Sequence, residues 1–219
     1  MAKAGEGEET VVVITWNYET STRVQVYSGF VIFKNEGELI WIELVHDSRE
    51  SLTDESRSYR SDDWTGCIYY DMVVTHNNTT PVYTILGWDG ADGKVTRKVI
   101  ETFIISNGTL RIGVPFIEVE KGLKKRHVLE YADILQVTLG FDSNRERIVF
   151  DHLAPNDPTL KGQTEFYGPT LEYDAYLWED GVWKAHFDVE LKNETENGRK
   201  KPYIDPKPDS PINISIKRK

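Results

Sequence analysis

Apolar and polar residues alternate along much of this chain, which is the pattern of extended strands. In residues 171–178 two rows alternate: Leu171, Tyr173, Ala175 and Leu177 with Glu172, Asp174, Tyr176 and Trp178. A strand directs alternate side chains to opposite faces of its sheet. We therefore predict that the first row faces the core and the second row faces solvent.

The alternation returns in residues 183–190, after Glu179-Asp180-Gly181. A two-residue Asp-Gly turn would set the apolar row of one strand against the polar row of the other. A three-residue loop, with Gly181 in a left-handed bulge, pairs Leu177 with Trp183 and keeps both apolar rows on one face. We predict this second register, in which Asp174 faces His186.

About a dozen strand patterns follow one another along the chain, joined mostly by short turns. No segment of helical periodicity is long enough to connect parallel strands. The predicted fold is all-β, an antiparallel meander closed as a barrel or stacked as a sandwich. Irregular propeller-like blades are the alternative, weakened by the lack of a clean repeat. Residues 39–42 are apolar on both faces, which predicts a central strand covered on both sides.

The ends of the chain differ in composition from its middle. Residues 1–10 lack apolar anchors and are predicted to be disordered, whereas residues 11–192 form a single all-β domain. Residues 193–219 are predicted to be an extended, proline-rich tail. The longest connection inside the domain, residues 46–63, is predicted to be a loop with at most one helical turn.

Charge and cysteine content narrow the function classes. The formal net charge of -10 over 219 residues repels phosphate backbones and anionic lipid, so no nucleic-acid partner is expected. No apolar run is long enough for a membrane-spanning helix. Cys67 is the sole cysteine, so no intrachain disulfide is expected. Residues 1–10 do not have the pattern of a signal peptide.

Two short stretches offer candidate metal ligands. Asp151 and His152 stand together at a strand end, and carboxylate with imidazole suits zinc, manganese or iron. Asp89 and Asp92 lie in a glycine-rich turn, as in a calcium loop, but the further acidic ligands of an EF-hand are absent. Capping of strand ends and turns explains both stretches better than a metal site does, and no compact ligand motif is present. We therefore predict no cofactor.

Carboxylates and aromatic rings suggest carbohydrate chemistry. Two of the acids Asp151, Glu165, Glu172 and Asp174 could cleave a glycosidic bond, at separations of about 5 Å or roughly 6.5–9.5 Å that a sequence does not reveal. Tyr176 and Trp178, on the predicted solvent face, could instead stack on a sugar. There is no serine elbow and no phosphate-binding glycine loop.

Several short motifs follow one another between Trp64 and Asn193, namely Leu86-Gly87-Trp88-Asp89-Gly90, Asp151-His152-Leu153-Ala154-Pro155 and Tyr167-Gly168-Pro169. In these motifs the chain resembles a family of uncharacterised exported proteins from Bacteroidetes-type bacteria. The resemblance implies a periplasmic or extracellular location. It implies no established activity and supplies no functional residues.

The sequence therefore predicts a non-enzymatic domain of the cell envelope or exterior that binds a protein or glycan partner or aids envelope assembly. Its candidate binding residues are Asp151, His152, Asp174, Tyr176, Trp178 and His186. The alternative is a carbohydrate-active or metal-assisted hydrolase that uses Asp151, His152 and Asp174. A third possibility is a pure glycan-binding module built on Trp178 and Tyr176.

Overall fold

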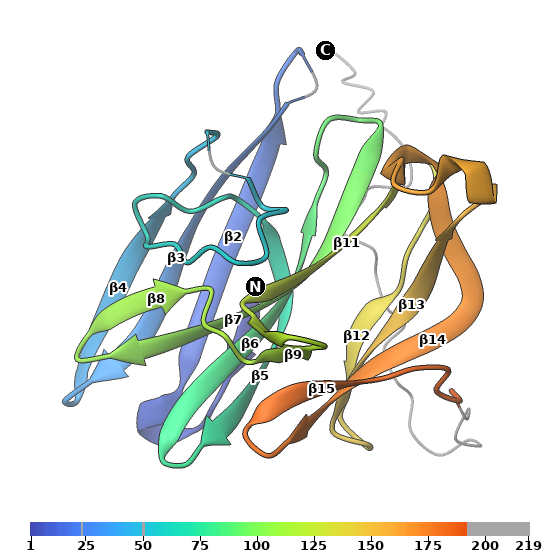
Figure 1. Cartoon of the computed structure of the whole chain (residues 1–219). Helices are drawn as coiled ribbons and strands as arrows, with labels where there is room; N and C mark the ends of the chain where they lie inside the picture. Colours follow the sequence, from blue (N-terminus) through green and yellow to red (C-terminus); the bar gives the residue numbers. More distant parts are fainter. Residues whose placement is uncertain (23, 50, 192–219) are drawn as a thin grey trace, which may run out of the picture.

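The computed structural model describes residues 1–22, 24–49 and 51–191 (Figure 1). These residues form fifteen strands and three short 3-10 helices, with no α-helix among them, so the predicted all-β antiparallel class is confirmed. The elements are β1 (Ala2–Ala4), η1 (Gly7–Glu9), β2 (Val11–Glu19), β3 (Gln25–Asn35), β4 (Glu38–Val45), β5 (Ile68–Asn77), β6 (Thr80–Asp89), β7 (Val95–Ser106), β8 (Thr109–Ile112), β9 (Ile117–Val119), β10 (Gly122–Lys124), β11 (Arg126–Ala132), β12 (Leu139–Asp142), β13 (Arg147–Pro155), η2 (Pro158–Leu160), η3 (Thr164–Phe166), β14 (Tyr167–Glu179) and β15 (Val182–His186).

The strands form three open sheets stacked in layers, in agreement with the sandwich alternative. The first sheet has the order β1-β2-β3-β4, and the central sheet has the order β11-β7-β6-β5 with β8 beside β7. The third sheet has the order β10-β9-β15-β14-β13-β12. Figure 1 shows the blue first sheet on the left, the green central sheet in the middle and the yellow and orange third sheet on the right.

The central sheet is covered on both faces by two separate apolar cores. Ile85 and Val99 belong to the core shared with the first sheet, whereas Leu86 and Ile100 belong to the core shared with the third sheet. Both faces of β6 and β7 are therefore buried, as expected for strands without a solvent face. The prediction of a central strand at residues 39–42 is wrong. β4 lies at the edge of the first sheet, with Leu39 69% and Trp41 65% exposed.

A buried ion pair connects the central sheet to the long loop of residues 46–63. The Arg126 Nε donates to Glu101 Oε1 over 2.8 Å, and both side chains are fully buried. Arg126 also donates to the Asp54 carbonyl oxygen and lies over the Tyr59 ring, 4.4 Å from its centroid. Tyr69 donates its hydroxyl to Glu101 Oε2 over 2.7 Å. The loop is thus anchored by polar contacts, and its described residues contain no helical turn.

The N-terminal residues are part of the fold, which corrects the prediction of disorder. β1 pairs with β2 in antiparallel register, and Ala2 is 2% exposed in the first core. The Glu9 carbonyl oxygen accepts a hydrogen bond from Tyr83 over 2.8 Å. Small alanine side chains fit against the packed sheet, although their low hydrophobicity gives little signal in the sequence. The predicted tail of residues 193–219 lies outside the described residues.

The β14–β15 hairpin has the register that the sequence analysis rejected. Trp178 pairs with Trp183 across a two-residue turn, Asp180-Gly181, so Ala175 and not Asp174 lies opposite His186. Both turn residues have positive φ, 53° and 80°, as a type I′ turn requires. The twist of this turn suits a two-stranded ribbon, and the two tryptophan rings meet edge to face at 5.3 Å.

The two rows of β14 are not separated into a core face and a solvent face as predicted, since Asp174, Ala175 and Tyr176 are all buried. Tyr176 is 4% exposed and lies in the second core, and Trp178 packs against the same core. Leu171, predicted to be buried, is 88% exposed. Aromatic rings bury more apolar area than Ala175 or Leu177, and their polar tips find partners inside the fold. None of the helices within the described residues is long and apolar enough to cross a membrane.

Candidate functional site

A cleft of about 850 Å³ opens where β11, the edge strand of the central sheet, lies beside β13 and β14 of the third sheet. Four of the six predicted binding residues line it: Asp151, His152, Asp174 and Tyr176. Its volume lies within the range of about 300–1,000 Å³ that is usual for ligand sites. The structure therefore brings together most of the residues that the sequence analysis selected.

An irregularity in the β13–β14 ladder shapes this side of the cleft. Asp151 pairs with Tyr173 and Leu153 pairs with Pro169, so His152 alone spans three residues of β14. Leu171, one of those three, has φ 73°, which is unusual for a bulky residue. A bulge bends the strand and changes the direction of its side chains. As a result, successive residues of β13 line the same cleft.

His152 and Asp174 form the central polar pair of the cleft. The His152 Nδ1 lies 2.7 Å from Asp174 Oδ2, and the Asp174 Oδ1 accepts the Asp188 backbone N–H over 3.3 Å. The Asp174 side chain is 8% exposed, whereas the His152 side chain is 43% exposed. A buried carboxylate thus fixes the orientation of an imidazole that still meets solvent. The second ring nitrogen of His152 is the group left for a ligand.

Asp151 contributes a second carboxylate, which is buried at the end of the core. Its Oδ2 accepts the Thr138 backbone N–H over 2.6 Å, so it closes the loop before β12. Burial raises the pKa of Asp151, and the hydrogen bonds from Thr138 oppose this rise. The capping role considered in the sequence analysis therefore accounts for one of its oxygens.

Tyr176 and His127 form the aromatic wall of the cleft. The Tyr176 hydroxyl lies 3.0 Å from His127 Nδ1, and both rings contact Phe150 at 5.3 Å. Burial, assisted by the charge of Lys124, lowers the pKa of His127 to about 3. His127 is thus neutral near pH 7, and burial raises the pKa of Tyr176. The sequence analysis missed His127, whose only signal was a polar residue inside an otherwise apolar strand.

Three glutamates complete the acidic lining, and the sequence analysis missed them as well: Glu118, Glu120 and Glu130. Glu130 accepts from Arg97 Nε over 2.5 Å and from the Thr164 hydroxyl, so it connects β11 to η3. Because β9 and β11 lie in different sheets, their acids converge only through the tertiary fold.

Two predicted residues lie away from the cleft. Trp178 packs on Phe116 and Trp183 and donates its ring N–H to the His76 carbonyl oxygen over 3.3 Å. His186 lies 3.2 Å from Glu179 on the hairpin surface. Neither residue belongs to the cleft lining. The predicted platform of Tyr176 with Trp178 is therefore divided between cleft and core.

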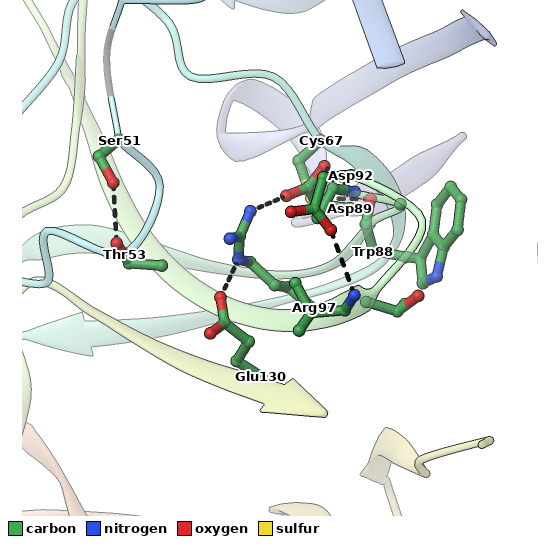
Figure 2. Close-up of polar contacts among 12 residues, drawn as sticks. Ser51, Thr53, Cys67, Trp88, Asp89, Asp92, Arg97 and Glu130 are labelled. Atoms are coloured by element: carbon green, nitrogen blue, oxygen red, sulfur yellow. Dashed lines mark hydrogen bonds and ion pairs between the residues drawn. The ribbon is translucent and has the colours of Figure 1, made fainter. Parts of the chain in front are cut away.

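The glycine-rich turn that offered calcium ligands has its carboxylates occupied by protein groups. Asp89 accepts from the Tyr27 hydroxyl over 2.6 Å and pairs with Arg97 Nη1 at 2.9 Å. Asp92 accepts the backbone N–H groups of Lys94 and Val95. Figure 2 shows Arg97 reaching Asp89 on one side and Glu130 on the other. Within the described residues, no cluster of three potential ligands is arranged to hold a metal ion.

Comparison with known proteins adds no family assignment. No family model, no curated protein and no solved structure matches this chain. The geometry and chemistry of the cleft therefore carry the functional argument.

Proposed function

We propose that this protein is a non-enzymatic binding module and that its cleft holds a glycan of a partner molecule. One observation carries the proposal. The cleft combines ligand-sized volume with five carboxylates and several aromatic rings, and its described lining contains neither lysine nor arginine. That combination favours neutral polyhydroxyl ligands, or cationic ones, over anions.

The polar groups of the cleft suit sugar hydroxyls. Carboxylates accept hydrogen bonds from hydroxyl groups, and a neutral imidazole both donates and accepts hydrogen bonds. Asp174 and Glu130 are each held by other protein groups, which fixes their positions before a ligand arrives. Fixed polar groups reduce the entropy lost on binding.

The apolar groups of the cleft suit the C–H faces of a sugar ring. Phe187 lines the opening and is 72% exposed, and Tyr167 lines it beside η3. The Tyr167 hydroxyl accepts the Gly162 backbone N–H over 3.0 Å, which holds its ring in place. An exposed phenylalanine beside acidic groups has little structural benefit, so a ligand that covers it explains its position.

Thermal melting of the full chain with panels of neutral, amino and uronic-acid oligosaccharides tests the proposal. A ligand at 100 times its Kd stabilises the folded state by about 2.7 kcal/mol, which for a chain of this size raises Tm by roughly 5–10 °C. We expect neutral or amino sugars to raise Tm and uronic acids to have no effect.

A matched pair of variants locates the binding. Phe187→Ala removes an exposed ring at the cleft, whereas Ile134→Ala removes an exposed side chain outside it. We expect only Phe187→Ala to reduce the Tm shift. The proposal is wrong if no oligosaccharide shifts Tm, if only uronic acids do so, or if Phe187→Ala binds as tightly as the parent chain.

A second function, hydrolysis of a glycosidic bond, is favoured by one specific observation. Asp151, with its pKa raised by burial, and the His152–Asp174 pair line the same cleft, and differing carboxyl environments are typical of acid–base chemistry. Mass spectrometry of a neutral oligosaccharide incubated with the protein tests it. Cleavage that is lost in His152→Gln, while binding persists, would establish an enzyme. An intact oligosaccharide leaves binding as the function.

We also propose a location in the periplasm or outside the cell. The support is the resemblance of the Leu86–Gly90, Asp151–Pro155 and Tyr167–Pro169 motifs to exported proteins. Fractionation of the source cells, followed by antibody detection, tests this location. Recovery of the protein in the cytosolic fraction would contradict it.

A further inference from the structure

The outer face of the first sheet is largely apolar, although the described chain places no layer over it. Alternation assigns this face to the residues of β2, β3 and β4 that point away from the first core. It includes Trp16, Tyr18, Phe30, Leu39, Trp41 and Val45. Figure 1 shows the sheet as an outer layer of the molecule. We call these six residues the outer aromatic face.

The aromatic residues of this face form a continuous row across three strands. The Trp16 and Phe30 ring centroids are 5.8 Å apart, and the Phe30 and Trp41 centroids are 5.6 Å apart. Trp16 is 46%, Tyr18 60% and Trp41 65% exposed. A contiguous exposed patch of this kind marks an interaction surface rather than an ordinary surface.

From this geometry we propose that a second copy of the chain covers the outer aromatic face, as a two-fold symmetric dimer packed sheet on sheet. Charge supports this occupant. The chain carries a net charge of -10, yet on this side of the first sheet the strands present only Lys3, Lys34 and Glu43 as charged side chains. Two copies can therefore approach through this face without the repulsion that their other surfaces create.

The area of the face suits a dimer. At roughly 200 Å² per aromatic side chain, the exposed parts of Trp16, Tyr18 and Trp41 amount to on the order of 300 Å². The aliphatic side chains of the face add a comparable area, so two copies would bury on the order of 1,200 Å² in total, the lower limit for a stable interface. Sheet faces also pack readily on one another at about 10 Å separation.

The orientation of the rings disfavours other occupants. The Phe30 and Trp41 rings are inclined by 72°, and the Trp16 and Phe30 rings by 38°, so they do not form the flat platform that stacks on a polysaccharide. The acidic charge of the chain opposes binding to anionic lipid. Inclined rings bury more of their surface when they interdigitate with a second, equally uneven face than when they lie against a flat ligand.

Sedimentation equilibrium of the full chain, from about 1 to 100 μM, tests the proposal. We expect a dimer that dissociates at the low end of this range. Trp41→Glu places a charge at the interface twice, once in each copy, and should raise the dimer Kd at least about tenfold. Ile134→Glu, at a residue that is 91% exposed elsewhere, is the matched control and should leave the Kd unchanged.

Melting curves distinguish a weakened dimer from an unfolded variant, and pelleting assays distinguish a second copy from other ligands. Circular dichroism should show that Trp41→Glu melts as cooperatively as the parent chain, since its side chain is largely exposed. A monomer at every concentration overturns the proposal, as does a dimer that Trp41→Glu does not weaken. Pelleting of the monomer with insoluble polysaccharide or with zwitterionic vesicles would reassign the face to those ligands. None of these outcomes depends on the cleft.

Discussion

His127 makes the stability of the fold depend on pH in a way that a substitution can isolate. Its imidazole lies between Phe150 and Tyr176, and burial lowers its pKa from 6.5 to about 3. Below pH 6.5 the unfolded chain binds a proton at this residue and the folded chain does not. Stability is therefore complete above the unfolded pKa and is lost as the pH falls toward the folded pKa.

The size of the stability loss follows from the shift in the pKa of His127. Each pH unit between the two pKa values costs about 1.4 kcal/mol, so a fall from pH 6.5 to about pH 5 costs roughly 2 kcal/mol. His127 also lines the cleft, which reduces the loss of stability, and we expect about 1–2 kcal/mol. His127→Asn keeps a polar atom near Tyr176 but cannot take up a proton in this range.

Urea unfolding followed by tryptophan fluorescence, at several pH values from about 7.5 to 5, measures the free energy of unfolding of the parent chain and of His127→Asn. All other titrating groups are common to both proteins, so their contributions cancel when the two curves are subtracted. The parent chain should lose about 1–2 kcal/mol more than His127→Asn over this range. Parallel curves would show that His127 is not the neutral, buried group described here.

Three further outcomes follow from the packing of the central sheet. Glu101→Gln leaves the buried Arg126 without its carboxylate and should lower the free energy of unfolding by about 3–5 kcal/mol, measured by urea titration. Gly87→Ala places a methyl group 2.3 Å from the Cys67 sulfur and should cost about 1–3 kcal/mol in the same assay, whereas Gly140→Ala, with open space around it, should cost nothing. The Cys67 thiol, buried and with its pKa raised, should react with a thiol reagent only after unfolding. Equal stability of the two alanine variants, an unaffected Glu101→Gln or rapid thiol labelling would each contradict this packing.

The alternation of residue types was sufficient to predict the fold class, because short strands with polar turns have few other solutions. It was insufficient for the faces of β14. Tyr176 and Trp178 were assigned to solvent with Glu172 and Asp174, although large aromatic rings gain most from burial. The Asp180-Gly181 dipeptide is typical of the type I′ turn that sets the observed register, whereas the alignment of apolar rows favours the other register.

The strand at residues 39–42 shows a second limit of sequence patterns. Apolar residues on both faces of a strand predict that both faces are covered. They do not indicate whether the covering layer belongs to the same chain. In β6 the covering layers belong to the same chain. In β4 the outer side chains Leu39 and Trp41 remain exposed. Likewise, the cleft acids on β9 and β11 meet only in three dimensions, so no local spacing could indicate them.

Coverage of the central sheet from both sides has a consequence for synthesis of the chain. Trp183, near the end of the described residues, donates its ring N–H to Thr84 of β6, and Tyr83 of the same strand donates to Glu9 near the start. Neither the N-terminal nor the C-terminal half of the chain can therefore bury both faces of the central sheet alone. Until β15 has left the ribosome, the middle strands expose one apolar side, and a nascent chain at that stage is a natural client for a chaperone.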